Sequence, residues 1–158
     1  MRILFDSKLP QFKTPFGTLT PGEKCTMTMY IPSTVGATMV SCIINRENGQ
    51  HQRNADLPFK ETQGPYDVFQ GSFELYDTGL FFYYFYVSHN SGGFRLFKQG
   101  DDTNMEDGGK WQISCIPADF YTPDWAKGAV IYQVFPDRFC NGTGEFLGNR
   151  TDIIKRNW

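Results

Sequence analysis

The chain has 158 residues, of which 40% are hydrophobic and 16% aromatic, so it can form one packed domain and is too short for a complete large enzyme. Fifteen Lys and Arg stand against seventeen Asp and Glu, and the net charge of −2 excludes a basic surface for nucleic acid or an anionic membrane. No apolar run approaches the roughly 20 residues of a membrane span, and Asp6 ends the short apolar N-terminus too early for a secretory leader. We therefore expect a cytoplasmic protein.

Short strands joined by turns are predicted for residues 1–120. The run 25–31 alternates between apolar and polar residues, which predicts a strand with Cys25, Met27, Met29 and Ile31 facing inward. The run 80–87 is apolar on both faces and predicts a central strand. Together with the other alternating runs, the predicted strands are 25–31, 38–44, 68–75, 80–87, 94–97 and 111–115. This pattern predicts an all-β, immunoglobulin-like antiparallel β-sandwich.

The four cysteines do not form a metal-ligand pattern. They stand singly at Cys25, Cys42, Cys115 and Cys140, without a C-x-x-C pair. The first three lie within predicted strands, where a reduced thiol packs as a small hydrophobic group. The acidic stretch 101–109 does not have the spacing of a calcium-binding loop, and we expect it to be a solvated hairpin or linker loop. No cofactor is therefore predicted from these residues.

The character of the chain changes from residue 121 onward. After a connector, the apolar run 129–135 resembles a strand buried on both faces, of the kind that occurs in parallel sheets. One such strand is not a domain, because it has no partner to pack against. We expect residues 121–158 to be a linker and the start of a second, truncated domain, so that the chain is the N-terminal piece of a longer protein.

The segment 122–142 reads TPDWAKGAVIYQVFPDRFCNG and resembles the entry into the catalytic (β/α)8 barrel of the α-amylase family, glycoside hydrolase family 13. In the neopullulanase, cyclomaltodextrinase and maltogenic amylase branch of that family, a β-sandwich N-domain precedes this barrel. Residues 6–8, 12–17 and 79–85 also look like parts of such N-domains. The resemblance implies that residues 129–135 form the first barrel strand and that the missing barrel is a partner of the sandwich.

The resemblance implies a parent enzyme that hydrolyses α-glucosidic bonds in starch, maltodextrin or pullulan with retention. The family's nucleophile, general acid and stabilising carboxylate follow later barrel strands, so this chain holds no catalytic residue and should be inactive alone. A retaining glycosidase needs two carboxyl groups about 5 Å apart on a rigid frame. In the family, a side chain at the position of Asn141 often binds calcium. Here Phe146 and Leu147 depart from the ligand pattern that follows it.

Four aromatic residues are candidates for binding an α-glucan. Phe82, Tyr84 and Tyr86 share one face of the predicted central strand, and Tyr66 lies in a turn. The alternative is that both faces of the strand are buried, because aromatic side chains dominate cores. The family branch also uses its N-domain in dimers, so a structural or homodimerisation module that binds no sugar is the second functional hypothesis.

Overall fold

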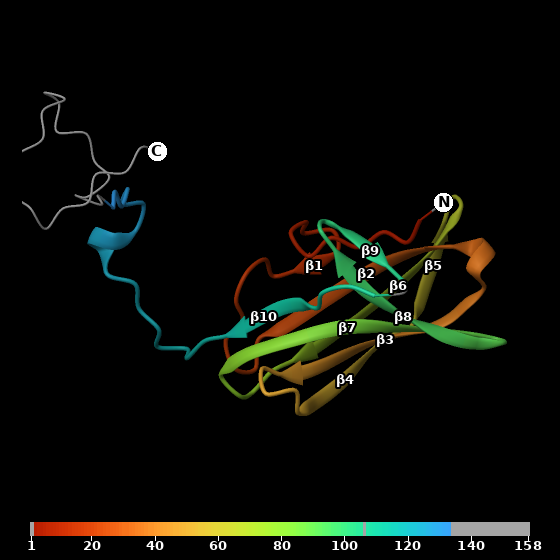
Figure 1. The fold of residues 1–158 in the computed structure, drawn as a ribbon, viewed down its shortest axis with the longest axis horizontal. Helices are drawn as coiled ribbons and strands as arrows, with labels where there is room; N and C mark the ends of the chain where they lie inside the picture. Colours follow the sequence, from red (N-terminus) through yellow and green to blue (C-terminus); the bar gives the residue numbers. More distant parts are fainter. Residues whose placement is uncertain (1, 106, 134–158) are drawn as a thin grey trace, which may run out of the picture. The chain divides into compact units, whose positions relative to one another are not determined.

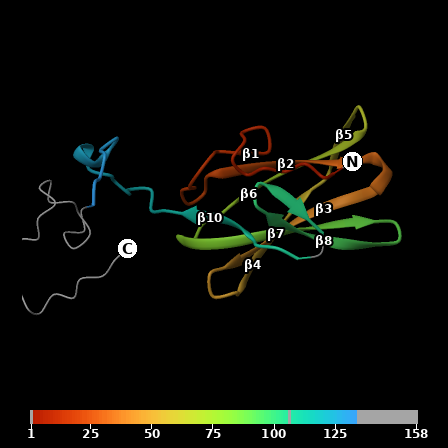
Figure 2. The same ribbon diagram turned by 45° about the horizontal axis from the view of Figure 1, so that its top comes forward.

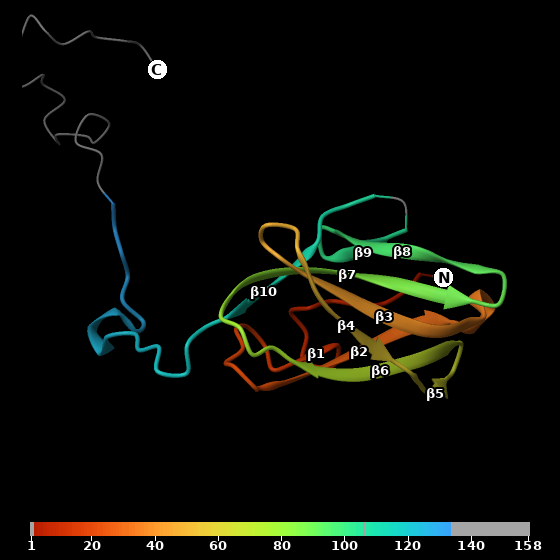
Figure 3. The same cartoon turned by 90° about the horizontal axis from the view of Figure 1, so that it is seen from below.

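The computed structural model describes residues 2–105 and 107–133. The chain divides into two compact units, Met1–Phe120 and Tyr121–Trp158, and each is described by itself. The first unit consists of two antiparallel β-sheets packed face to face (Figures 1 and 3). Two packed sheets, with no α-helix among the described residues of this unit, confirm the all-β prediction for residues 1–120, while the immunoglobulin-like topology stays a prediction.

The smaller sheet has the strand order β1-β2-β6-β5. Its strands are β1 (Lys13–Thr14), β2 (Lys24–Pro32), β5 (Phe59–Gln63) and β6 (Tyr66–Glu74). The larger sheet has the order β4-β3-β7-β8-β9, and β10 also pairs with β7. Its strands are β3 (Ala37–Arg46), β4 (His51–Leu57), β7 (Gly79–His89), β8 (Gly92–Gln99), β9 (Asp102–Asn104) and β10 (Trp111–Cys115). A short 3-10 turn, η1 (Ser33–Val35), links β2 to β3 and so joins the two sheets.

The core lies between the sheets and follows the predicted alternation. The inward residues Cys25, Met27, Met29 and Ile31 of β2 are fully buried. The strand β7 is central in the larger sheet, because β3 pairs with one of its edges and β8 and β10 with the other. All six predicted strands are present, and the central position predicted for 80–87 is confirmed.

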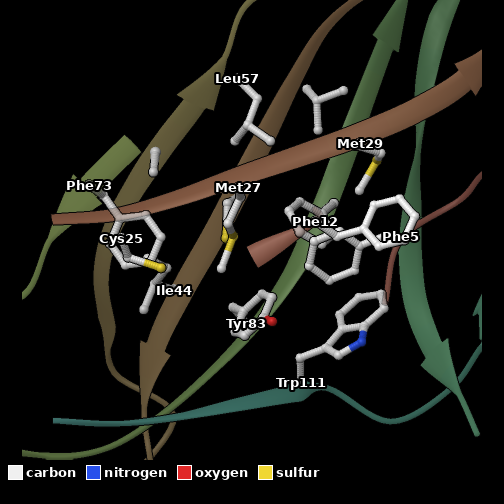
Figure 4. Close-up of a cluster of buried hydrophobic side chains, with 14 of the residues drawn as sticks. Phe5, Phe12, Cys25, Met27, Met29, Ile44, Leu57, Phe73, Tyr83 and Trp111 are labelled. Carbon is white, nitrogen blue, oxygen red and sulfur yellow. The ribbon is translucent and has the colours of Figure 1, made fainter. Parts of the chain in front are cut away.

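An aromatic cluster joins the N-terminal segment to the larger sheet (Figure 4). The ring of Phe5 lies edge-on to Phe85 at 4.8 Å and to Trp111 at 5.2 Å. Trp111 stacks on Tyr83 at 5.6 Å with an interplanar angle of 20°. Edge-on and stacked aromatic pairs add to the energy of burial. The N-terminal segment is therefore part of the core.

The strands β4 and β5 were not predicted, and they bring the two sheets together. β4 ends at Leu57 and β5 begins at Phe59, so the chain passes from one sheet to the other within a single residue, Pro58. At this crossing, β4 approaches Gly71 of β6 so closely that an added Cβ would lie 2.2 Å from the carbonyl oxygen of Asp56. Glycine at position 71 is what allows the two backbones to approach this closely.

The thiols and the acidic loop take the roles expected of them. Cys25, Cys42 and Cys115 are free and buried, which confirms their prediction as core thiols, while Cys140 lies outside the described residues. Burial raises the pKa of Cys25 to about 11.

In the acidic loop, Asp101 pairs with Lys8 at 2.5 Å and Asp102 pairs with Arg2. These carboxylates therefore fasten the loop to the N-terminal segment.

The described part of the second unit contains one 3-10 turn, η2 (Asp124–Ala126). The ammonium group of Lys127 lies 2.7 Å from the Asp124 carboxylate. Residues 129–133 form no strand, and the rest of the expected barrel strand lies outside the described residues, as does the candidate calcium ligand Asn141. Within residues 2–105 and 107–133, no helix has the length and apolar character needed to cross a bilayer.

Candidate functional site

The outward side of β7 carries a row of half-buried and exposed aromatic side chains. Phe81, Tyr83 and Phe85 are fully buried in the core. The residues between them point to the opposite side, because side chains alternate along a strand. Phe82 and Tyr84 are half-buried there, and Tyr86 is 38% exposed. The inward face of β7 is therefore buried, as the alternative hypothesis for this strand expected of both faces. The outward face is only partly buried and is accessible to a ligand.

A fourth ring comes from β8 and broadens this row. The register of β7 and β8 pairs Phe85 with Leu96, which brings Phe97 beside Tyr84. The rings of Tyr84 and Phe97 stack at 5.6 Å with an interplanar angle of 22°. We call Phe82, Tyr84, Tyr86 and Phe97 the outward aromatic face. Three of them were predicted from the alternation of residues.

The position of Tyr86 depends on a glycine across the strand pair. A Cβ on Gly93 would lie 2.5 Å from the Tyr86 hydroxyl and 2.6 Å from its Cζ, so the tyrosine ring lies over the backbone of Gly93. Tyr86 pairs with Arg95 of β8 on one side and with Ser41 of β3 on the other. Glycine at position 93 leaves room for the ring to lie flat on the sheet.

Two cations lie beside the outward aromatic face. The guanidinium carbon of Arg95 lies 6.0 Å from the centre of the Tyr84 ring, and the ammonium nitrogen of Lys110 lies 5.9 Å from it. These distances are at the limit of attraction between a cation and an aromatic ring. Sequence reasoning missed Arg95, Phe97 and Lys110, because only the strand register brings them to Tyr84.

The row ends in a hollow at the beginning of β7. Leu80 lies two residues before Phe82 on the same side of the strand, and it lines a hollow of about 320 Å³. The remaining lining residues are Gly79 and the polar residues Arg46, Glu47 and Asn48. This hollow at the start of β7 therefore offers hydrogen-bonding groups, although none of the four aromatic residues lines it.

The fourth predicted residue, Tyr66, belongs to a different surface. It lies at the start of β6 in the smaller sheet, where it pairs with Pro32 of β2. Its ring is edge-on to Tyr30 at 6.4 Å, and the side chain is half-buried. The structure brings Phe82, Tyr84 and Tyr86 together and leaves Tyr66 on the other sheet.

An accessible aromatic face flanked by donors suits a ligand with an apolar face and a polar edge. A pyranose ring has both, because its C–H groups stack on aromatic rings while its hydroxyl groups accept and donate hydrogen bonds. Arg95 and Lys110 are donors beside the face. The described residues of this face therefore offer aromatic surface and hydrogen-bond donors.

The structure defines a two-sheet β-sandwich whose larger sheet carries the outward aromatic face. No protein-family model matches the chain. The chain is 27% identical over 150 residues to an amylopullulanase from Thermoanaerobacterium saccharolyticum, which covers 87% of this chain and 11% of that protein. A similar match, 27% over 154 residues, is to an amylopullulanase from Thermoanaerobacter thermohydrosulfuricus, covering 87% of this chain and 10% of that one.

A short segment is also similar to neopullulanase 2 from Thermoactinomyces vulgaris, at 74% identity over 23 residues, 15% of this chain and 4% of that one. The chain spans about a tenth of the length of the two amylopullulanases. These relatives confirm the resemblance to α-amylase-type enzymes that residues 122–142 indicated.

Proposed function

We propose that the chain is a non-catalytic β-sandwich of an α-glucan hydrolase, and that its outward aromatic face binds the glucan. The observation that carries this proposal is the row of Phe82, Tyr84 and Tyr86, joined by Phe97, on the accessible side of an otherwise buried strand. The amylopullulanase relatives support a substrate of the α-glucan class. Binding here would keep a long substrate close to the catalytic domain of the same protein.

The proposed parent enzyme is a retaining hydrolase, and this piece of it has no activity of its own. Its catalytic carboxylates would lie in the barrel that follows the sandwich. The two acids Asp101 and Asp102 of the acidic loop are held by Lys8 and Arg2. Their ion pairs support a structural role for this loop rather than a catalytic one.

A second candidate function is association between two copies of the sandwich. The observation that favours it is the edge strand β5, whose five residues are all exposed, including Phe59 at 52%. An edge strand offers unpaired backbone groups that another chain can bind. Sedimentation velocity over a range of concentrations separates this function from sugar binding, because a strict monomer would exclude it.

The test of sugar binding is an NMR titration of the 158-residue chain with maltoheptaose. We expect chemical shift changes at residues of the outward aromatic face and a dissociation constant in the millimolar range. Tyr86→Ala should weaken binding at least about fivefold, because stacking on one aromatic ring is worth about 1 kcal/mol or more. Tyr66→Ala should leave binding unchanged, since Tyr66 lies on the other sheet.

The matched control is Tyr76→Ala, which removes another tyrosine, 68% exposed, whose hydroxyl donates to Glu74 at 2.6 Å. It should bind maltoheptaose as the unchanged chain does. An absence of shift changes at millimolar sugar, or equal losses in the Tyr86 and Tyr76 variants, would contradict the proposal.

A further inference from the structure

The two cations beside Tyr84 are exposed and have no ion-pair partner among the described residues. Other cations of the first unit, such as Lys8 and Arg46, pair with carboxylates at 2.5 and 2.6 Å. Arg95 and Lys110 instead have Tyr84 as their common neighbour. Their charge is therefore available to a ligand that lies on the outward aromatic face.

The strand arrangement explains why these cations meet at one ring. β8 pairs with the end of β7 from Phe85 onward, and β10 pairs with its beginning up to Tyr83. Tyr84 therefore lies between the two paired stretches. Figure 2 shows β10 and β8 beside different parts of β7. A backbone bridge between Lys98 and Gly109 closes the loop that joins them and places Lys110 next to Tyr84.

Charge on this side of the sheet is unevenly distributed. The cations lie on the β8 and β10 side of β7. On the other side, the Asp56 carboxylate of β4 accepts a hydrogen bond of 2.7 Å from the Ser41 hydroxyl of β3. The strand β3 separates β4 from β7, so this carboxylate does not neutralise Arg95 or Lys110. Arg95 and Lys110 thus lie along one border of the aromatic surface, where the loop between β8 and β10 also carries Asp101 and Asp102, which pair with Lys8 and Arg2, and the exposed Asp107.

We propose that the outward aromatic face binds an α-glucan that carries a phosphate monoester, with the sugar ring on Tyr84 and Phe97 and the phosphate between Arg95 and Lys110. This inference rests on the proposed function and narrows its ligand. A phosphate monoester carries a charge of about −1.5 to −2 at pH 7 and three acceptor oxygens. A guanidinium group and an ammonium group are the donors that such an ester needs.

The geometry fits an ester on a sugar better than a free anion. Both cations lie over the Tyr84 ring, at 6.0 and 5.9 Å from its centre, and Phe97 stacks on the same ring. A pyranose that contacts the accessible parts of these two rings therefore has an exocyclic phosphate within reach of both cations.

The experiment compares four ligands by NMR titration of the 158-residue chain at low salt. They are maltotriose, maltotriose with one 6-phosphate ester, glucose 6-phosphate and inorganic phosphate. We expect the phosphorylated trisaccharide to bind about fivefold more tightly than maltotriose, as two exposed ionic contacts allow. This ratio should rise as the pH passes about 6, where the ester takes its second charge, and should fall toward one at high salt.

The double variant Arg95→Gln/Lys110→Gln should bring the affinity ratio close to one. The matched control is Lys24→Gln/Lys60→Gln, which removes two exposed lysines from the smaller sheet and should leave the ratio near five. Circular dichroism and thermal unfolding check that both variants are folded. These variants separate local charge at the site from the net charge of the protein.

Three results would overturn the inference. Equal affinity for the two trisaccharides would show that the phosphate ester makes no contribution to binding, and it would leave the proposed binding of an α-glucan unaffected. Equal affinity for inorganic phosphate and the phosphorylated trisaccharide would show an anion site without a sugar. No binding of either trisaccharide, even at millimolar concentration, would remove the proposed function as well.

Discussion

Replacing Gly71 by alanine should destabilise the sandwich strongly, because this glycine lies where the two sheets touch. The new Cβ would lie 2.2 Å from the Asp56 carbonyl oxygen and 2.9 Å from the Leu57 Cα. Both are backbone atoms of β4, so no flexible side chain can move away. Shifting β4 from β6 by about an ångström would disturb the core that they share. We expect a loss of about 3 kcal/mol in the free energy of unfolding, the upper range for an overpacked core.

Urea denaturation monitored by far-ultraviolet circular dichroism measures this loss. For a domain of ordinary stability, about 5 to 15 kcal/mol, the midpoint should shift by a molar unit of urea or more. The matched control is Gly109→Ala, since a Cβ there meets only the Lys98 carbonyl oxygen at an ordinary 3.8 Å. Its free energy of unfolding should change by less than about 1 kcal/mol. Equal midpoints for the Gly71 variant and the unchanged chain would refute the close approach of β4 and β6.

Two further predictions concern the buried thiols and the aromatic face. Burial raises the pKa of Cys25 from 9.0 to about 11, so the folded chain retains a proton that the unfolded chain releases, and the free energy of unfolding should fall as the pH rises from about 9 to about 11. For this thiol the free energy of unfolding should fall by about 3 kcal/mol over that pH range. Urea denaturation at several pH values measures the fall, which should be smaller in Cys25→Ala. A free energy of unfolding that does not change with pH would contradict the prediction. Gly93→Ala should displace the Tyr86 ring, whose hydroxyl would lie 2.5 Å from the new Cβ, and should weaken maltoheptaose binding about threefold by NMR titration. Because the new Cβ would also lie 2.7 Å from the Val87 carbonyl oxygen, thermal unfolding checks that the variant is folded, and unaltered affinity in the folded variant would contradict the prediction.

The strands with regular alternation could be predicted from sequence, and the others could not. In β2 and β7, side chains of one face are buried as a set, so the pattern is visible without knowledge of the fold. β4 contains only two buried residues, Ala55 and Leu57, and β5 contains none. Their strand conformation comes from pairing with β3 and β6, which no local pattern records.

The same distinction applies to the candidate site. Phe82, Tyr84 and Tyr86 could be placed on one face because they lie two residues apart on a strand. Arg95 and Lys110 stand 15 residues apart in the chain, and they meet at Tyr84 only because β8 and β10 share one edge of β7. Predicting this meeting requires the register of both pairs, which depends on the complete sheet.

The two faces of β7 can change at different rates during evolution. The inward residues Phe81, Tyr83 and Phe85 are packed on all sides, so most substitutions there reduce the population of folded molecules. The outward residues Phe82, Tyr84 and Tyr86 are half-buried or exposed, so substitutions there reduce that population less. Inserting one residue within β7 would reverse the facing of every side chain on one side of the insertion, which would bring outward residues into the core and turn inward residues toward solvent. The outward surface of this sheet can therefore diverge between related proteins through point substitutions, provided that the strand keeps its length.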